Sequence, residues 1–197
     1  MERWLLAVFF VVYFTTAFVW RSWQVWRKTG VNPYVLPHSD DAQGYVAKAF
    51  RLVLLTMAAY VAVQAAWPDA DSSLPQIDWL VAGAIRLAGW CTLLASLMWV
   101  MLAQMQMGTS WRIGIDVKNE TALVRNGLFA LSRNPIFLAM RASLLGLLLV
   151  RPNALTLVLA VAGELLMQMQ VRQEEDFLRQ RHGAAYLDYC AHTPRWI

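Results

Sequence analysis

The chain has 197 residues, of which 58% are hydrophobic and 15% are charged. Ordinary soluble domains carry about a quarter charged residues, so this composition excludes a typical soluble domain and predicts a protein embedded in a membrane. The formal net charge of +4 is too modest to indicate a nucleic-acid partner. The length predicts a single domain over residues 1–197.

Five apolar stretches, taken in chain order, are predicted to cross a bilayer. A spanning helix needs about 20 mostly apolar residues, or somewhat fewer where flanking side chains reach the interface. The predicted spans are residues 4–20, 52–67, 79–105, 136–150 and 154–170. No small-residue cleavage site follows the first, so we interpret it as a retained helix rather than a signal peptide. The last two are joined by Arg-Pro-Asn, which is short enough to require a tight helical hairpin.

The basic residues predict the orientation, because they accumulate in cytoplasmic loops. Residues 21–51, residues 106–135 and the tail after residue 171 each carry at least four lysines or arginines. The loop 68–78 carries none and has three aspartates. This alternation predicts an external N-terminus and a cytosolic C-terminus, in a prokaryotic inner membrane or another intracellular membrane.

Three charged residues, Arg86, Arg141 and Glu164, fall inside predicted spans, where each costs about 2.5–3.5 kcal/mol on insertion scales. Arg141 and Glu164 lie ten and eleven residues from the hairpin turn. Antiparallel arms with equal rise per residue place them at the same depth, so we predict that they make contact. The pair either locks the hairpin or lines the floor of a cavity. Arg86 has no obvious partner in the sequence, and we expect it to snorkel toward the nearby end of its helix.

Cysteine and histidine usage predicts neither a disulfide nor a metal site. Cys91 falls in an apolar segment and Cys190 in the polar tail, so we expect no bond between them. The histidines (His38, His182 and His192) are scattered, and no Cys/His spacing indicates zinc.

Polar groups gather at the predicted cytosolic ends of the third, fourth and fifth spans, in QMQMGTSWRIG, SRNP and QMQVRQEED. We expect the third loop and the tail to meet there and to roof a pocket above apolar helices. Pro135 suits the first turn of a helix, and Asn134 can cap that helix through its side-chain oxygen. The planar guanidinium of Arg133 is suited to bind a carboxylate. Taken alone, Arg133 could equally be one of the basic residues that accumulate on the cytosolic side. Glu174 and Glu175 alone fit a plain first-turn feature of a helix.

The order of these groups adds information. TALVRNGLFALSRNPIFLAM, followed about forty residues later by QEEDFLRQRHGAAYLDYCAHTPRWI, resembles the isoprenylcysteine carboxyl methyltransferase family and its phospholipid methyltransferase relatives. The resemblance covers roughly residues 108–197. It implies an S-adenosylmethionine-dependent methyltransferase that acts at the cytosolic membrane face on a lipophilic or membrane-associated carboxylate, amine or thiol. It does not identify the substrate.

The resemblance also implies a cytosolic cofactor-binding part, about residues 108–137 and 171–197, and particular site residues. Those implied to contact the cofactor are Thr121, Ala122, Leu123, Val124, Phe129, Asn134, Pro135, Ile136, Phe137, Glu174 and Glu175. The implied catalytic residues are Arg133 and Glu174, and Gln170 and Arg172 stand near the position of a family arginine on the substrate side. Asn134 replaces the family histidine, and Phe129 and Phe137 replace tyrosines.

Our hypothesis is that Glu174 orients the polar groups of the cofactor, while Arg133 anchors a carboxylate of the cofactor or the substrate. A lipophilic substrate would enter laterally from the bilayer. Two other classes stay open: an NADPH-dependent membrane reductase of related architecture, and a non-enzymatic small membrane protein. The sequence leaves the oligomeric state open.

Overall fold

The computed structural model describes residues 2–36, 41–67 and 69–197, so His38 lies outside the described residues. These residues form helices and loops, and no strand occurs among them. The longer helices are α1 Glu2–Phe14 with a π-helical continuation η1 Thr15–Trp20, α2 Arg21–Thr29, α3 Ala42–Ala66, α4 Gly83–Met107, α6 Pro135–Val150, α7 Ala154–His182 and α8 Ala184–His192. The single turn α5 is Leu128–Leu131, and 3-10 turns cover Ala70–Ser73, Asp78–Leu80 and Gly108–Ser110.

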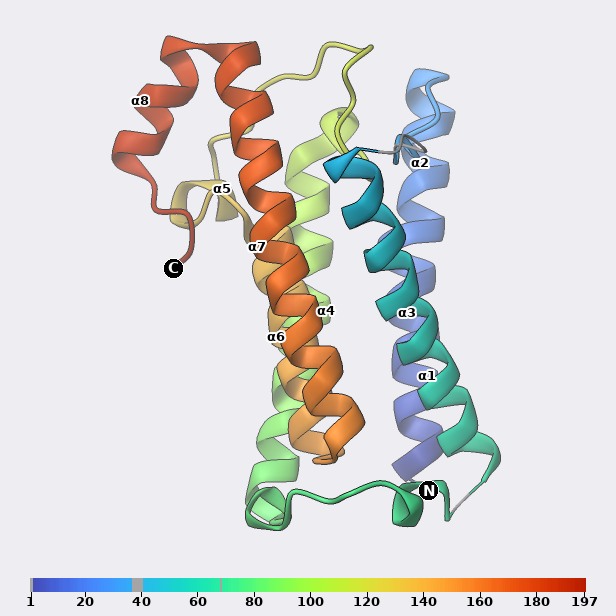
Figure 1. The fold of residues 1–197 in the computed structure, drawn as a ribbon. Coiled ribbons are helices and arrows are strands. Elements are labelled where there is room, and N and C mark those ends of the chain that lie inside the picture. Colours follow the sequence, from blue (N-terminus) through green and yellow to red (C-terminus); the bar gives the residue numbers. More distant parts are fainter. Residues whose placement is uncertain (1, 37–40, 68) are drawn as a thin grey trace.

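The long helices run side by side and alternate in direction, so the loops collect at two ends (Figure 1). One end holds the loop 108–134 and the tail 183–197, and we call it the collar end. The opposite end holds the N-terminus, the loop 67–82 and the turn 151–153. The loops therefore alternate between the ends as the charge pattern predicts.

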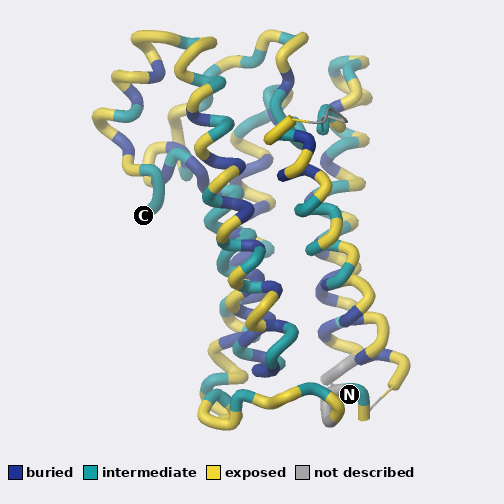
Figure 2. The backbone as a smooth tube through the Cα atoms, viewed as in Figure 1, coloured by how far each residue is buried: buried dark blue, intermediate teal, exposed yellow. Residues whose placement is uncertain are grey.

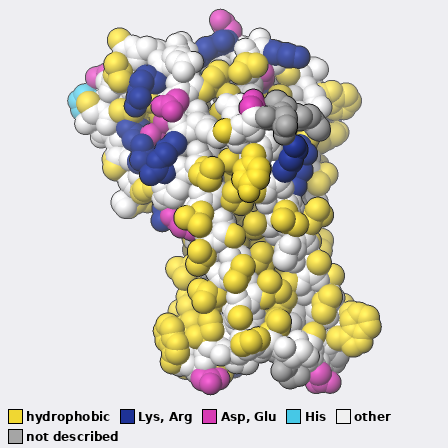
Figure 3. All heavy atoms as spheres, viewed as in Figure 1, with side chains coloured by type: hydrophobic (Ala, Val, Ile, Leu, Met, Phe, Trp, Pro, Cys, Tyr) yellow, Lys and Arg dark blue, Asp and Glu magenta, His cyan; other side chains and the backbone are white. Residues whose placement is uncertain are grey.

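Four helical segments are long and apolar enough to cross a membrane: Trp4–Thr29, Ala42–Ala66, Gly83–Ser110 and Ala154–His182. The helix α6 is apolar but has 16 residues, about 24 Å at the usual rise per residue, against about 30 Å of hydrocarbon. The fifth span expected at 136–150 therefore stays a prediction. Figure 3 shows the waist of the molecule covered by hydrophobic side chains, with lysines and arginines gathered toward the collar end. This distribution is that of an integral membrane protein.

Two helices are longer than the apolar windows suggested. The helix α3 begins at Ala42, where the Asp41 side chain accepts a hydrogen bond from the Gly44 amide at 2.8 Å. The helix α7 continues unbroken to His182, well past residue 170, where the predicted span ends. Hydropathy marks where charge begins, but helical hydrogen bonding continues past that point because each residue still offers an N–H to the preceding turn. Gly183 separates α7 from α8.

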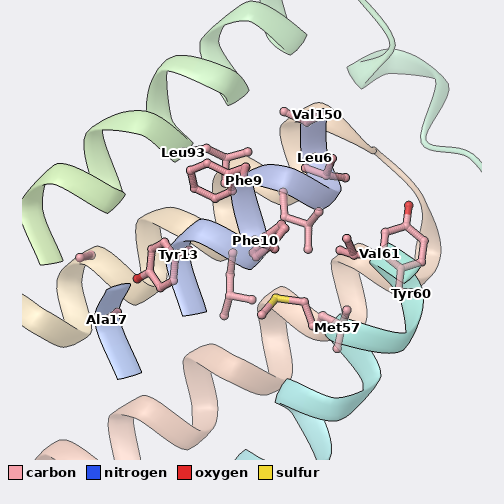
Figure 4. Packing of buried hydrophobic residues seen from close by; sticks show 14 of the residues in the cluster. Leu6, Phe9, Phe10, Tyr13, Ala17, Met57, Tyr60, Val61, Leu93 and Val150 are labelled. Atoms are coloured by element: carbon pink, nitrogen blue, oxygen red, sulfur yellow. The ribbon is translucent and has the colours of Figure 1, made fainter. Parts of the chain in front are cut away.

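The core lies along the inward faces of these helices, which the dark segments of Figure 2 trace. Leu6, Phe10 and Tyr13 of α1 are buried in one hydrophobic cluster with Met57 and Val61 of α3, and Figure 4 shows part of this cluster from close by. Their spacing of three or four residues places them on one stripe of the helix. The outward faces stay apolar as well, because lipid rather than water surrounds them.

The helices α4 and α6 approach each other especially closely, and two glycines make this possible. A Cβ at Gly146 would lie 2.8 Å from the Leu93 Cγ and 3.1 Å from the Gly89 carbonyl oxygen. A Cβ at Gly89 would lie 2.9 Å from the Val150 amide nitrogen. Small residues of this kind allow membrane helices to pack backbone to backbone.

The hairpin between α6 and α7 forms as predicted. The Asn153 side chain accepts from the Thr156 amide, and the Thr156 hydroxyl accepts from the Asn153 amide, which makes a capping box. The predicted ion pair is confirmed, with 2.6 Å between the Arg141 Nε and the Glu164 Oε2.

A polar contact also joins the first span to α4. A π-helical turn frees a backbone carbonyl from the regular pattern, and the Gln104 side chain donates to the carbonyl of Ala17 at 2.9 Å. Both groups are buried. The Arg21 guanidinium of α2 likewise donates to the Gly108 carbonyl, so the first span is held against the start of the loop at the collar end.

Candidate active site

The site is built around the start of α6. The short helix α5 ends at Leu131, and Pro135 occupies the first turn of α6, as its fixed φ favours. Asn134 stands at the N-cap but makes no side-chain capping bond, so the expectation that its oxygen caps α6 is wrong. Its side-chain nitrogen, Nδ2, instead donates toward the Glu175 Oε1 at 3.4 Å and to the Arg195 carbonyl at 3.3 Å. A carboxylate is the stronger hydrogen-bond acceptor, and it draws the amide away from the helix start.

Glu175 is the centre of an ion cluster. Only 4% of it is exposed, and it pairs with the Arg133 Nη2 at 3.2 Å. Arg195 approaches the same carboxylate with two nitrogens, Nε at 3.0 Å from Oε1 and Nη2 at 2.7 Å from Oε2. Two guanidinium groups around one carboxylate leave the cluster with a net positive charge. The hydrogen bond to Glu175 raises the pKa of Arg195 above its ordinary value.

Glu174 does not join this cluster. Its carboxylate accepts a hydrogen bond from the side-chain amide of Gln170 at 3.0 Å, and Gln170 lies one turn earlier on α7. Gln170, which the family resemblance put on the substrate side, is buried. Arg172 is exposed and donates to the carbonyl and the side chain of Gln168. The prediction that Glu174 serves a polar group of the cofactor stays a prediction, and the structure pairs Arg133 with Glu175.

The C-terminal tail holds the cluster in place. The Arg133 amide donates to the Pro194 carbonyl at 3.0 Å, and the Ser132 hydroxyl donates to the Arg195 carbonyl at 3.1 Å. The Tyr189 hydroxyl donates to the Phe129 carbonyl at 2.5 Å. Burial raises the pKa of Tyr189 to about 12, so this hydroxyl keeps its proton throughout the physiological range. The loop and the tail therefore meet, as predicted.

The segment Thr121–Val124 lies in the loop that precedes α5. It has no regular secondary structure and is half-buried except for the exposed Ala122. No hydrogen bond or ion pair among the residues described joins it to Arg133 or Glu175. Four residues further on, the start of α5 is held by Gln106, whose side-chain oxygen accepts a hydrogen bond from the Leu128 backbone N–H at 2.8 Å.

Gly127 allows that contact. Its φ of +64° is a conformation that side-chain-bearing residues rarely adopt, and a Cβ there would lie 2.5 Å from the Gln106 amide nitrogen. The remaining residues implied by the resemblance follow the cluster on α6, where Ile136 and Phe137 are half-buried and pack against the core.

The cluster residue that the sequence analysis missed is Arg195. The family resemblance included a closing Pro-Arg pair, and that pair was the available signal. Nothing local in the chain indicates its partner, since Glu175 lies twenty residues away on another element.

A bundle of long apolar helices with a buried ion cluster at one end defines an integral membrane protein with a polar site at its rim. Residues 84–185 match the family model described as phospholipid methyltransferase. The match covers more than half of the chain, so the protein belongs to this family of membrane methyltransferases and is consistent with its isoprenylcysteine-type relatives. No curated protein and no solved structure matches the chain. The matched range includes Arg133, Glu174 and Glu175 but ends before Arg195.

Proposed function

We propose that the protein is an S-adenosylmethionine-dependent methyltransferase that acts at the cytosolic membrane face on a lipophilic acceptor. The observation that supports this most is the Arg133–Glu175–Arg195 cluster, which lies at the collar end of a chain that belongs to a membrane methyltransferase family. The basic residues gathered at that end support its cytosolic placement.

The residues present fit such a cofactor. In the part of the chain that the structure describes, the Arg133 Nε is buried without a hydrogen-bond acceptor. Buried polar groups of proteins are normally paired, so this atom offers a donor to an anionic ligand. The amino-acid part of S-adenosylmethionine carries a carboxylate that would satisfy it.

In this proposal each residue has a separate task. S-adenosylmethionine supplies a methyl group on a positively charged sulfur. Arg133 binds a carboxylate of the cofactor or the acceptor, and Glu174 orients the cationic part of the cofactor. Glu175 and Arg195 hold the Arg133 side chain in position. Thr121–Val124, Phe129, Pro135, Ile136 and Phe137 supply the apolar walls that resemble those of the family.

The site contains an amide where the family has a histidine. Asn134 does not accept a proton near neutral pH, so proton transfer at that position is not part of the mechanism. The rate enhancement then rests on positioning, which is worth up to about 7–11 kcal/mol in favourable cases. A carboxylate acceptor needs no base, whereas an amine acceptor must arrive deprotonated.

Isothermal titration of the purified protein with S-adenosylmethionine tests the proposal. We expect saturable binding to the wild type, weakened at least about tenfold in Glu174→Gln by the loss of a charged contact. Asp176→Asn, an exposed change on the same helix, is the matched control. A wild type that binds NADPH and not S-adenosylmethionine would replace the proposal with a reductase. Transfer of a radiolabelled methyl group into the lipid fraction or the protein fraction identifies the acceptor class.

A further inference from the structure

A groove with a volume of about 490 Å³ opens between α6 and α7, beneath the end of the tail. Its walls are largely apolar, with Leu138, Leu145 and Ala160 among them. Arg141 and Glu164 form its polar part, and Trp196 covers one edge. The cluster residues Arg133 and Glu175 do not line it, so the groove is separate from the candidate active site.

In the groove, the acceptor oxygens have hydrogen-bond partners but some of the donor nitrogens do not. Both oxygens of Glu164 have donors, since Oε2 accepts from the Arg141 Nε at 2.6 Å and Oε1 accepts from the Gln168 Nε2 at 2.8 Å. Arg141 uses only its Nε in this way, and the Trp196 ring covers the face of its guanidinium at 4.4 Å. Within the described part of the chain, the two terminal nitrogens have no acceptor, and 31% of the side chain is exposed.

These unused N–H groups lie at membrane depth. Arg141 is six residues along α6 from its first residue, Pro135, about 9 Å at the usual rise per residue. A guanidinium in hydrocarbon is expensive unless it is paired, and an unpaired donor there has no bulk water to satisfy it. Because the carboxylate is already satisfied and the guanidinium is not, the group that completes the site is an acceptor, and a negative charge suits it best.

A line of polar side chains leads from the collar end down to this site. Arg172 donates to the Gln168 Oε1 at 2.9 Å, and Gln168 donates to Glu164, each four residues apart on one face of α7. Such a line offers successive polar partners to a head group that moves from the interface into the groove. The surrounding leucines offer apolar surface to its chain.

We propose that this groove binds an amphiphile with an anionic head, a phosphate ester or a carboxylate, drawn from the leaflet on the collar side. The head lies on the terminal nitrogens of Arg141 and the chain lies along α6 and α7. Trp196, which touches Arg141, directly follows Arg195, which binds Glu175, so the occupied groove borders the ion cluster. The binding does not rest on the proposed function. Only the identification of this amphiphile as the class of the methyl acceptor rests on it.

The test measures binding in a neutral detergent without any methyl donor. The probes are oleate and oleoyl lysophosphatidate, with the zwitterionic oleoyl lysophosphatidylcholine as the chain-matched control. The groove variant combines Arg141→Gln and Glu164→Gln, so neither charge is left without its partner. Its control is Asp176→Asn with Arg179→Gln, an exposed pair on the same helix. We expect at least one anionic probe to bind the wild type and the control variant with equal affinity. Its affinity for the groove variant should be about 10- to 100-fold lower.

Equal binding to wild type and to the groove variant would overturn the proposal, as would equal binding of the zwitterionic probe. If the groove variant does not fold, a brominated form of the bound probe replaces it. This probe should quench the fluorescence of the wild type more than that of Trp196→Phe, and equal quenching counts against the site. Binding of the anionic probe by a protein that does not bind S-adenosylmethionine would refute the proposed function and leave the groove proposal intact. Binding of S-adenosylmethionine without binding of the probe would refute the groove proposal and leave the proposed function intact.

Discussion

At the scale of single residues, the site depends on one carboxylate shared by two arginines. Arg133 and Arg195 both reach Glu175, so its removal leaves two guanidinium groups facing each other with no counter-charge between them. Breaking a buried ion pair at one partner is far more harmful than replacing the whole pair. Among the described residues, Glu174 has a hydrogen bond from Gln170 alone, so its carboxylate can serve a ligand.

We therefore expect Glu175→Gln to lower the free energy of unfolding by on the order of 3 kcal/mol. Thermal or denaturant unfolding in detergent measures the change. Asp176→Asn, whose side chain is 67% exposed, should differ little from the wild type. Equal stability of the two variants would show that the cluster does not hold the tail against α6.

Asp116 has a comparable role in the loop at the collar end. Its carboxylate accepts from the Arg112 side chain and from the backbone and side chain of Asn119. Burial opposes its ionisation, but these hydrogen bonds together with one from the Lys118 amide prevail and lower the pKa of Asp116 below its usual 3.8.

Because folding lowers the pKa of Asp116, its ionised carboxylate stabilises the folded loop at any pH above the ordinary pKa. This stabilisation is lost as the pH falls through the lowered pKa of the folded state. We expect limited proteolysis by pepsin to cut residues 108–127 increasingly as the pH falls below about 4. Asp116→Asn should be cut more readily at the upper end of this range and should change less with pH. A variant with the same pH profile as the wild type would exclude Asp116 as the cause.

At the scale of helices, the firmest contact is between α4 and α6. The two glycines at their crossing leave no room for a side chain, since added Cβ atoms would meet a backbone nitrogen and the branch point of a leucine. This crossing positions the start of α6, and with it Arg133 and Asn134, relative to the loop that leaves α4.

Gly146→Val should separate these helices and destabilise the protein by about 1–3 kcal/mol, the usual range for overpacking. Gly83→Ala is the control, because a Cβ at Gly83 meets nothing within 4 Å. Unfolding midpoints of the two variants give the comparison. If the Gly146→Val protein were as stable as the control, α4 and α6 would be able to move apart without loss of stability.

At the scale of the whole molecule, the collar end and the opposite end face different solutions. Asp188 lies in α8 at the collar end and Ser73 in the loop at the other end, and both are exposed. The distribution of lysine and arginine predicts that the collar end is cytosolic.

Single cysteines test this orientation in a background of Cys91→Ala and Cys190→Ala. A maleimide that does not cross membranes should label Ser73→Cys in intact cells and Asp188→Cys only after lysis. Labelling of Asp188→Cys in intact cells would invert the topology and place the proposed site outside.

The sequence by itself determined the membrane class, the alternation of the loops between two ends and the contact between Arg141 and Glu164, and its motifs pointed to the methyltransferase family. These depend on composition, on helical rise and on local spacing, which are properties of short stretches of chain. Only the tertiary structure decided that Glu175 rather than Glu174 pairs with Arg133, that Arg195 completes the cluster, and that Asn134 turns from the helix start toward a carboxylate. Adjacent residues on a helix point about 100° apart, so the choice between them depends on which neighbouring element is packed against that face.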